Sequence, residues 1–227
     1  MTRGLTLLHT SHRHVPVFDA LRDRHHPGAR LCHVVRPGLL ARARAEGPEA
    51  VVDELRGLLR EAGPVTPASH VTSASRPPAV PVVLCTCSTI GAVAEGLAAE
   101  LGVAVLRVDR PMAAEAVRLG PRIVVLATVG STLGPTVELI EEEARAAGRE
   151  VAVRTVLVPG AFDRFEAGDL DGSLALVAAA ADVHTPADTD VIVSAQVSMA
   201  GAAALTRTPV PVLAAPALGL AAALRME

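Results

Sequence analysis

Two cysteines separated by a single residue end an apolar run in the stretch VVLCTCSTIG, residues 82–91. Such a pair could hold a metal, form a redox couple, or combine one packed thiol with one reactive thiol. Structural zinc sites take their cysteines in pairs with two to four residues between them, whereas only one residue separates Cys85 from Cys87. A disulfide between these two cysteines would fit disulfide geometry poorly. The spacing favours two thiols with separate roles and no metal, and a metal-binding or thiol-sensing protein stays a remote alternative.

The two thiols differ in their expected surroundings. Cys85 lies inside the apolar run and is expected to pack as a small hydrophobic residue. Cys87 is predicted to end the strand and to expose its thiol just before a helix. The free N–H groups and the dipole of a helix N-terminus would stabilise a thiolate there. Cys87 is therefore the predicted catalytic residue, as an acid, a base or a nucleophile that needs no cofactor.

Hydroxyl pairs recur between a strand and the helix that follows it, at residues 10–11, 88–89 and 131–132. Hydroxyl and backbone N–H groups at such turns can bind a carboxylate, although the same side chains could simply cap the helices. With the neighbouring polar residues they form the predicted substrate-binding set: His9, Thr10, Ser11, Ser88, Thr89, Thr128, Ser131, Thr132, Gln196 and Ser198.

Two further groups of residues could complete the site. Histidine titrates near neutral pH, so a histidine near a strand end could supply a second acid or base. An arginine could pair with a second carboxylate, or could equally be a solvated surface charge. Asp109, two residues before Pro111, is predicted to cap a helix rather than to act in catalysis. The histidines are His9, His12 and His33, and the arginines are Arg36, Arg107 and Arg110.

Apolar runs alternate with helical patterns along the chain. Several runs lack polar alternation (VPVVLC, RIVVLATV, DVIVSAQV), as is typical of parallel strands buried on both faces. This order predicts an α/β fold with parallel sheets flanked by helices. Surface loops are predicted at residues 64–81 and 184–190. The strands are predicted at residues 5–10, 30–35, 80–87, 103–108, 122–129, 151–158, 190–198 and 210–214, and the helices at 49–61, 92–101, 113–119, 135–147 and 172–181.

The two halves of the chain echo each other, because each contains strands that end in small polar loops. Ligands bind at the carboxyl ends of parallel strands, so we expect two pseudo-symmetric lobes with the active-site cleft between them. The N-terminal lobe is predicted to comprise residues 1–109 plus 210–227, and the C-terminal lobe residues 110–209.

These motifs together resemble the cofactor-independent aspartate/glutamate racemase superfamily, which also contains hydantoin racemases, maleate isomerases and arylmalonate decarboxylases. Cys-Ser-Thr at residues 87–89 resembles the Cys-Asn-Thr motif of that family, and VVLATVGST at 124–132 resembles its Leu-Ala-Thr segment. LLHTS at 7–11 and VIVSAQVSM at 191–199 stand where hydantoin racemases carry an Asn-Pro-Asn-Thr-Ser turn and a Gly-Cys-Ala-Gly-Met turn.

The resemblance implies an isomerase in which one cysteine from each lobe exchanges a proton at the α-carbon of a small carboxylate. It also implies a homodimer. This chain departs from the pattern, since Gln196 stands where the second cysteine is expected and an amide exchanges no proton at neutral pH. Three alternatives stay open: a single-cysteine decarboxylase, a cis–trans isomerase, and a carboxylate-binding regulatory protein without catalysis.

Composition excludes several other classes of function. The chain of 227 residues contains no lysine, so neither a pyridoxal phosphate Schiff base nor a P-loop lysine can form. A net charge of −3 with scattered arginines gives nucleic acid little to bind. No apolar run approaches the roughly 18 residues of a membrane span. Three cysteines without a secretory signal predict a cytoplasmic protein.

Overall fold

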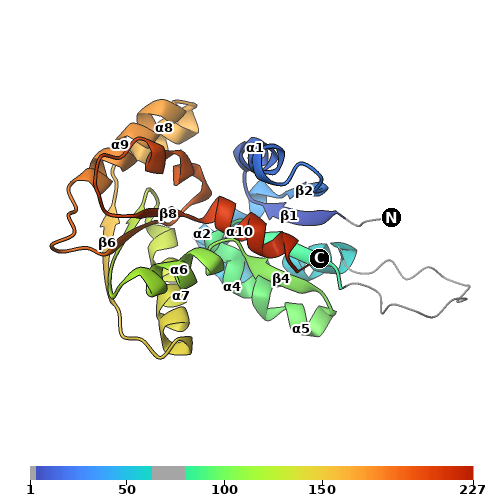
Figure 1. Cartoon of the computed structure of the whole chain (residues 1–227). Helices are drawn as coiled ribbons and strands as arrows, with labels where there is room; N and C mark the ends of the chain where they lie inside the picture. Colours follow the sequence, from blue (N-terminus) through green and yellow to red (C-terminus); the bar gives the residue numbers. More distant parts are fainter. Residues whose placement is uncertain (1–3, 63–79, 227) are drawn as a thin grey trace, which may run out of the picture.

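The computed structural model describes residues 4–62 and 80–226, which form two lobes side by side (Figure 1). Each lobe is built on a four-stranded parallel sheet, with the strand orders β2-β1-β3-β4 and β6-β5-β7-β8. The predicted fold class is confirmed, including the repeated architecture of the two halves. Most of the predicted loop at 64–81 lies outside the described residues.

The first sheet contains β1 (Leu5–His9), β2 (Leu31–Val35), β3 (Val82–Cys85) and β4 (Ala104–Arg107). Alternate residues of its central strands enter different cores: Leu84 joins the core shared with the second lobe, whereas Val83 and Cys85 join the core of the first lobe alone. Burial on both faces explains why β3 reads as a continuous apolar run. The helical elements of the first lobe are η1 (His12–His14), α1 (Val15–His25), α2 (Pro37–Glu46), η2 (Pro48–Val51), α3 (Val52–Ala62), α4 (Ser88–Gly96) and α5 (Ala98–Leu101).

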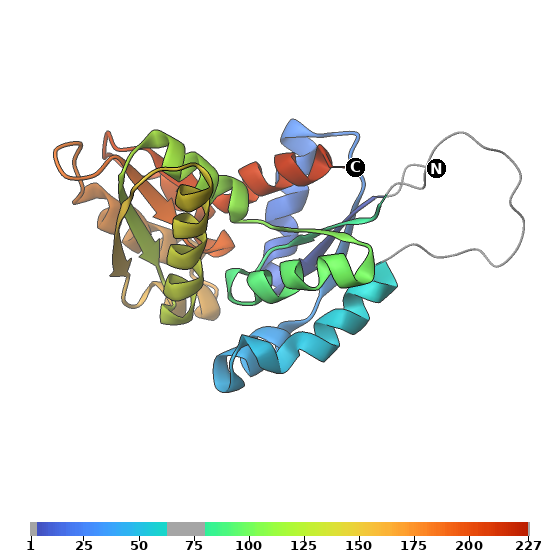
Figure 2. The ribbon, with the colours of Figure 1, turned by 90° about the horizontal axis from the view of Figure 1, so that it is seen from below.

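The second lobe repeats this plan, with helices on both faces of its sheet (Figure 2). Ile123 and Val125 pack in the shared core and Val124 and Leu126 in the core of the second lobe. Its strands are β5 (Arg122–Ala127), β6 (Ala152–Leu157), β7 (Val191–Ser194) and β8 (Val212–Ala214), and its helical elements are α6 (Arg110–Leu119), η3 (Gly130–Thr132), α7 (Leu133–Ala146), α8 (Ala161–Ala167), α9 (Leu170–Asp182) and η4 (Val197–Ala204).

The C-terminal segment crosses between the lobes later than predicted. The segment 210–227 was expected to return as a unit to the first lobe, but β8 pairs with β7 in the second sheet. The return begins at α10 (Ala215–Leu224), which packs on α1, β3 and α6 and is visible between the lobes in Figure 1. Nearly all of α10 is apolar, so it lacks the amphipathic period that marks a surface helix.

Six strands end one to four residues earlier than predicted, and the ends of β3 and β7 place site residues. The run at 80–87 ends as β3 at Cys85, and Cys87 occupies the N-cap of α4. The run at 190–198 ends as β7 at Ser194, and Gln196 occupies the N-cap of η4. The predicted helices also omitted α1, α2, α8 and α10. The sequences of α1, α2 and α10 have little amphipathic period, and α8 is only seven residues long, so none of the four shows a clear helical pattern.

Candidate active site

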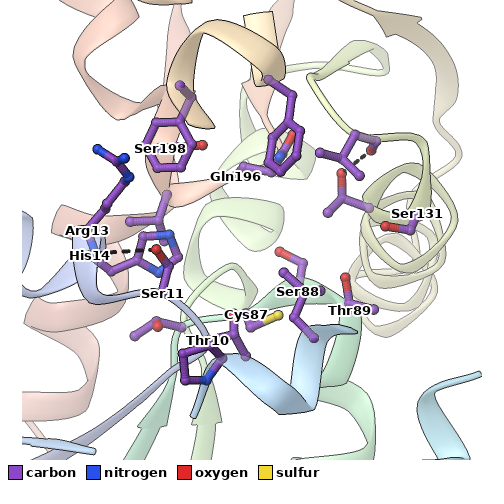
Figure 3. Close-up of a pocket in the computed structure, with 18 of the residues that line it drawn as sticks. Thr10, Ser11, Arg13, His14, Cys87, Ser88, Thr89, Ser131, Gln196 and Ser198 are labelled. Carbon is purple, nitrogen blue, oxygen red and sulfur yellow. Dashed lines mark hydrogen bonds between the residues drawn. The ribbon is translucent and has the colours of Figure 1, made fainter. Parts of the chain in front are cut away.

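A cavity of about 440 Å³ opens between the lobes at the carboxyl ends of the strands. The turn after β1, helix α2 and the start of α4 line it from the first lobe, and η3, α8 and the start of η4 line it from the second (Figure 3). The predicted site residues that line it are Thr10, Ser11, Cys87, Ser88, Thr89, Ser131, Thr132, Gln196 and Ser198.

Cys87 lies on the wall of this cavity formed by the first lobe, with Gln196 and Ser198 on the opposite side (Figure 3). Its exposed fraction is only 8 %, so the expectation of an exposed thiol is wrong: the thiol is enclosed between the lobes. Cys87 caps α4 without a side-chain hydrogen bond, which leaves its sulfur free to face a ligand. The first-turn N–H groups of α4 lie beside it.

Cys85 is fully buried among apolar side chains, as the sequence predicted. Burial and the neighbouring Cys87 raise the pKa of Cys85 to about 12. Its thiol therefore stays protonated at neutral pH and has no access to the cavity. Among the residues that the structure describes, no cluster of three or more histidine, cysteine or acidic side chains could hold a metal.

The hydroxyl groups at the strand ends divide into two kinds. Ser11 accepts a hydrogen bond from the N–H of Arg13, and Thr132 donates to the carbonyl of Val129, so both serve their own turns. Ser88 Oγ donates to the carbonyl oxygen of Ala195 at 3.1 Å and joins the lobes. The helix-capping alternative therefore holds for Ser11. Ser88 and Thr132 do not cap a helix and instead donate hydrogen bonds to backbone carbonyls.

Three buried polar atoms on the cavity wall have no hydrogen-bond partner within residues 4–62 and 80–226: Thr89 Oγ1, Ser131 Oγ and His14 Nδ1. A buried polar atom without a partner is costly, roughly 1–3 kcal/mol each. These three atoms around one cavity are candidate partners for a polar ligand. Thr89 and Ser131 come from different lobes, so a ligand that binds both would join the lobes.

Gln196 has a defined orientation. Its Oε1 accepts hydrogen bonds from the backbone N–H of Thr128 at 2.7 Å and from Thr128 Oγ1 at 3.1 Å. Because a backbone N–H can only donate, the amide oxygen must face Thr128 and the NH₂ group is left for other partners. The predicted role of Thr128 in substrate binding changes accordingly: Thr128 is outside the cavity wall and orients Gln196.

His9 is also absent from the cavity wall. It is fully buried beneath it and bonds to Thr86 and His33, so neither histidine reaches a ligand directly. Of the three histidines considered as a second acid or base, only His12 lines the cavity. His9 faces inward because it lies on the same face of β1 as Leu5 and Leu7, which pack in the shared core.

The arginines considered for a second carboxylate are not at the cavity either. Arg107 forms a buried pair with Asp109, whose carboxylate binds this guanidinium instead of capping α6 as predicted. Arg110 pairs with Glu95, Glu142 and Glu143. Arg36 is exposed and bonds to a neighbouring carbonyl.

The cavity wall contains two arginines that were not predicted from the sequence, Arg13 and Arg44. Their guanidinium groups lie over the rings of Phe165 and Phe162 at 5.4 and 5.3 Å from the ring centroids. Arg13 also donates a hydrogen bond to the backbone carbonyl of Glu166 at 3.2 Å. The pattern SHRH after the first strand could have pointed to Arg13 and His14. Arg44 and the two phenylalanines come from helices that were not predicted.

Burial makes the folded protein sensitive to acid. Burial lowers the pKa of His9 to about 3, with further contributions from His14 and His33, and lowers the pKa of His14 to about 4. The unfolded chain protonates both near pH 6.5, so the free energy of unfolding falls as the pH drops from about 6.5 towards 4. At about pH 5 we expect a loss of roughly 2 kcal/mol per histidine.

Urea denaturation at about pH 7.5 and pH 5 would measure this loss. His14→Gln should reduce the loss by about half, whereas His25→Gln, at an exposed position, should leave it unchanged. Equal unfolding free energies of the wild type at the two pH values would contradict the prediction.

Solved structures that are similar to this chain include racemases and a decarboxylase. Aspartate racemase from Picrophilus torridus superposes with a TM-score of 0.64 at 12 % identity, covering 98 % of this chain and 94 % of that one. Allantoin racemase from Pseudomonas fluorescens gives 0.56 at 18 % identity, over 99 % and 90 % of the two chains. A mutant of arylmalonate decarboxylase gives 0.59 at 16 % identity, over 99 % and 93 %. No protein-family model and no curated protein matches the sequence. These likenesses establish a shared fold, the two-lobed α/β fold of the racemases.

Proposed function

We propose that this protein is a cofactor-independent enzyme that transfers a proton at the carbon next to a carboxylate, with Cys87 as the acid or base. The observation that carries the proposal is the free thiol of Cys87 at the N-terminus of α4, on the wall of a cavity that also presents unpartnered polar atoms. The fold shared with racemases and with a decarboxylase supports the same chemistry.

The substrate carboxylate is assigned to the hydroxyls of Thr89 and Ser131 and to the first-turn N–H groups of α4. These neutral donors can bind an oxyanion and stabilise the added charge of an enediolate. Arg13 and Arg44 make the cavity attractive to anions without requiring direct contact with the substrate. The cavity volume suits a small substrate such as an amino acid or a related acid.

The amide of Gln196 supports chemistry on one face of the substrate. Its NH₂ group can donate a hydrogen bond to a developing oxyanion but cannot return a proton to carbon. Cys87 is then the proton-transfer group on its side, and the opposite side holds the substrate by hydrogen bonds. This asymmetry favours, as the second candidate, a decarboxylase or cis–trans isomerase that protonates one face of an intermediate.

Incubation in D₂O with candidate amino acids, hydantoins and substituted malonates tests the proposal. Deuterium at the α-carbon, measured by mass spectrometry, indicates proton transfer, and the chirality of the product separates racemisation from one-sided protonation. Loss of CO₂ identifies a decarboxylase. Tight binding of a small carboxylate without deuterium uptake would contradict the proposal and favour a binding protein.

We predict that Gln196→Cys changes the stereochemical outcome. A thiol at this position can exchange a proton on the face opposite Cys87, so a product of one configuration should become racemic. Chiral chromatography of the product after complete turnover is the measurement. Gln196→Asn, which keeps an amide, is the matched control and should retain the wild-type configuration at a lower rate. A product of unchanged configuration from the cysteine variant would show that Gln196 does not face the reacting carbon.

A further inference from the structure

A chain of four hydrogen-bonded side chains leads from the protein surface to the residue before Cys87. Asp19 Oδ1 on α1 lies 3.4 Å from His33 Nε2 on β2, and His33 Nδ1 lies 2.8 Å from His9 Nε2 on β1. His9 Nδ1 lies 2.8 Å from Thr86 Oγ1, directly after β3. The exposed fractions of the side chains are 36 % for Asp19 and 16 % for His33, whereas His9 is fully buried. The chain therefore connects solvent to the floor of the cavity.

With both imidazoles neutral, every hydrogen bond in the chain is satisfied in one direction. Thr86 donates to His9 Nδ1, His9 donates through Nε2–H to His33 Nδ1, and His33 donates through Nε2–H to Asp19. Each imidazole uses one donor and one acceptor, as a neutral ring requires. This arrangement holds three mobile protons.

One added proton reverses the direction of the inner bonds. His33 becomes a cation that donates through Nε2–H to Asp19 and through Nδ1–H to His9. His9 stays neutral, moves its proton to Nδ1 and donates to Thr86. The hydroxyl of Thr86 then donates to the carbonyl oxygen of Leu8, which lies 3.1 Å away. The hydroxyl thus has two acceptors within reach and one hydrogen to give.

The added proton is assigned to His33, because that imidazole faces a carboxylate. Burial lowers the pKa of His9 to about 3, with further contributions from His14 and His33. His33 instead faces the Asp19 carboxylate, which is also bound by Arg22 at 2.9 Å. Among the described residues, the charged and titratable groups that contact this chain are His14, Asp19 and Arg22, and the carboxylate of Asp19 lies at the His33 end.

We propose that His9 and His33 are positioning residues that form a proton-sensitive relay, which sets the hydrogen bond of Thr86 and through it the surroundings of Cys87. Uptake of one proton from solvent at the Asp19 end turns the Thr86 hydroxyl from His9 to Leu8 and brings a positive charge beneath the site. Both changes alter the electrostatic field at the neighbouring thiol, and the positive charge favours the thiolate form. Only the catalytic consequence rests on the proposed function.

Histidine side-chain ¹⁵N NMR tests the relay without any substrate. As the pH falls and His33 becomes doubly protonated, the neutral His9 ring should move its proton from Nε2 to Nδ1. Asp19→Asn should shift this transition to lower pH, and His33→Gln should abolish it. His9→Asn identifies the His9 signals. A single His9 tautomer throughout the titration of His33 would overturn the proposal.

The rate of Cys87 alkylation by iodoacetamide tests the link to the site. The measurement uses a Cys32→Ser background, because Cys32 is exposed, and peptide mass spectrometry. We expect a step of about two- to fivefold in the pH profile, coincident with the His33 titration. This step should be absent in His33→Gln and retained in His25→Gln, where an exposed histidine outside the relay is changed. Identical profiles in wild type and His33→Gln would overturn the link, whether or not a substrate is known. Asp19→Asn, at a partly exposed position, provides the same comparison should the buried variants misfold.

Discussion

Replacing Cys87 by serine is expected to lower the rate of α-proton exchange about 10³-fold. Serine has nearly the same shape, so the lining of the cavity and the start of α4 should persist. Its hydroxyl, however, is a far weaker acid than a thiol and cannot take up or deliver a proton at neutral pH. The rate of deuterium incorporation into a substrate found by the D₂O assay is the measurement.

Cys85→Ala is the matched control for this variant. Cys85 is a fully buried thiol two residues away, and alanine removes that thiol without adding a polar atom to the core. It should keep the exchange rate within about threefold while costing roughly 1 kcal/mol of stability. Full exchange activity in Cys87→Ser, or a collapse of activity in a folded Cys85→Ala, would contradict the assignment of Cys87.

Asp109→Ala is expected to destabilise the folded protein by roughly 3–5 kcal/mol. Asp109 binds the Arg107 guanidinium through two hydrogen bonds of 3.0 and 2.9 Å, and the exposed fractions of the two side chains are 1 % and 4 %. Alanine would leave a buried guanidinium without its counter-charge. Arg107 also donates to the carbonyl of Pro135 on α7, so the same loss loosens the contact between the lobes.

Chemical denaturation of Asp109→Ala beside Glu115→Ala measures this difference. Glu115 also pairs with an arginine, Arg118, but that pair is solvent-exposed and should contribute little to stability. Replacing Arg107 and Asp109 together by leucine should recover part of the loss, because no unpaired charge then remains buried. Equal costs for Asp109→Ala and Glu115→Ala would show that water reaches the Arg107 pair.

The part of the fold predicted from sequence depends on local periodicity. The apolar strands and the helices α3, α6, α7 and α9 could be predicted from short-range patterns. A strand buried on both faces and an amphipathic helix each produce a recognisable pattern of apolar residues over a few consecutive positions. The missed helix α10 is apolar on nearly every side since it packs between the lobes. That environment is set by segments more than a hundred residues away, so local periodicity does not report it.

The positions at which β3 and β7 end also depend on tertiary structure rather than on local sequence. Both apolar runs continue past the last residue that pairs with a neighbouring strand. Each strand ends just before the backbone turns into the helical element that follows. The N–H of Thr86 still bonds to the carbonyl of Leu8, and the chain then turns into α4 at Cys87. The correction moves Cys87 from a strand end to a helix N-cap and from exposed to enclosed.

Local patterns were sufficient to determine the parallel α/β architecture and a packed Cys85, and to predict Cys87 as the reactive thiol beside a helix N-terminus. Both cysteine assignments follow from residues within a few positions of each other.

Which hydroxyl groups are free for a ligand was decided only by the tertiary structure. Ser88 is bonded to Ala195, more than a hundred residues away, whereas Thr89 and Ser131 have no partner among the described residues. The orientation of Gln196 by Thr128 and the burial of His9 between β2 and β3 were decided in the same way. Hydrogen bonds of this kind depend on distances between elements far apart in the chain, and sequence spacing does not encode those distances.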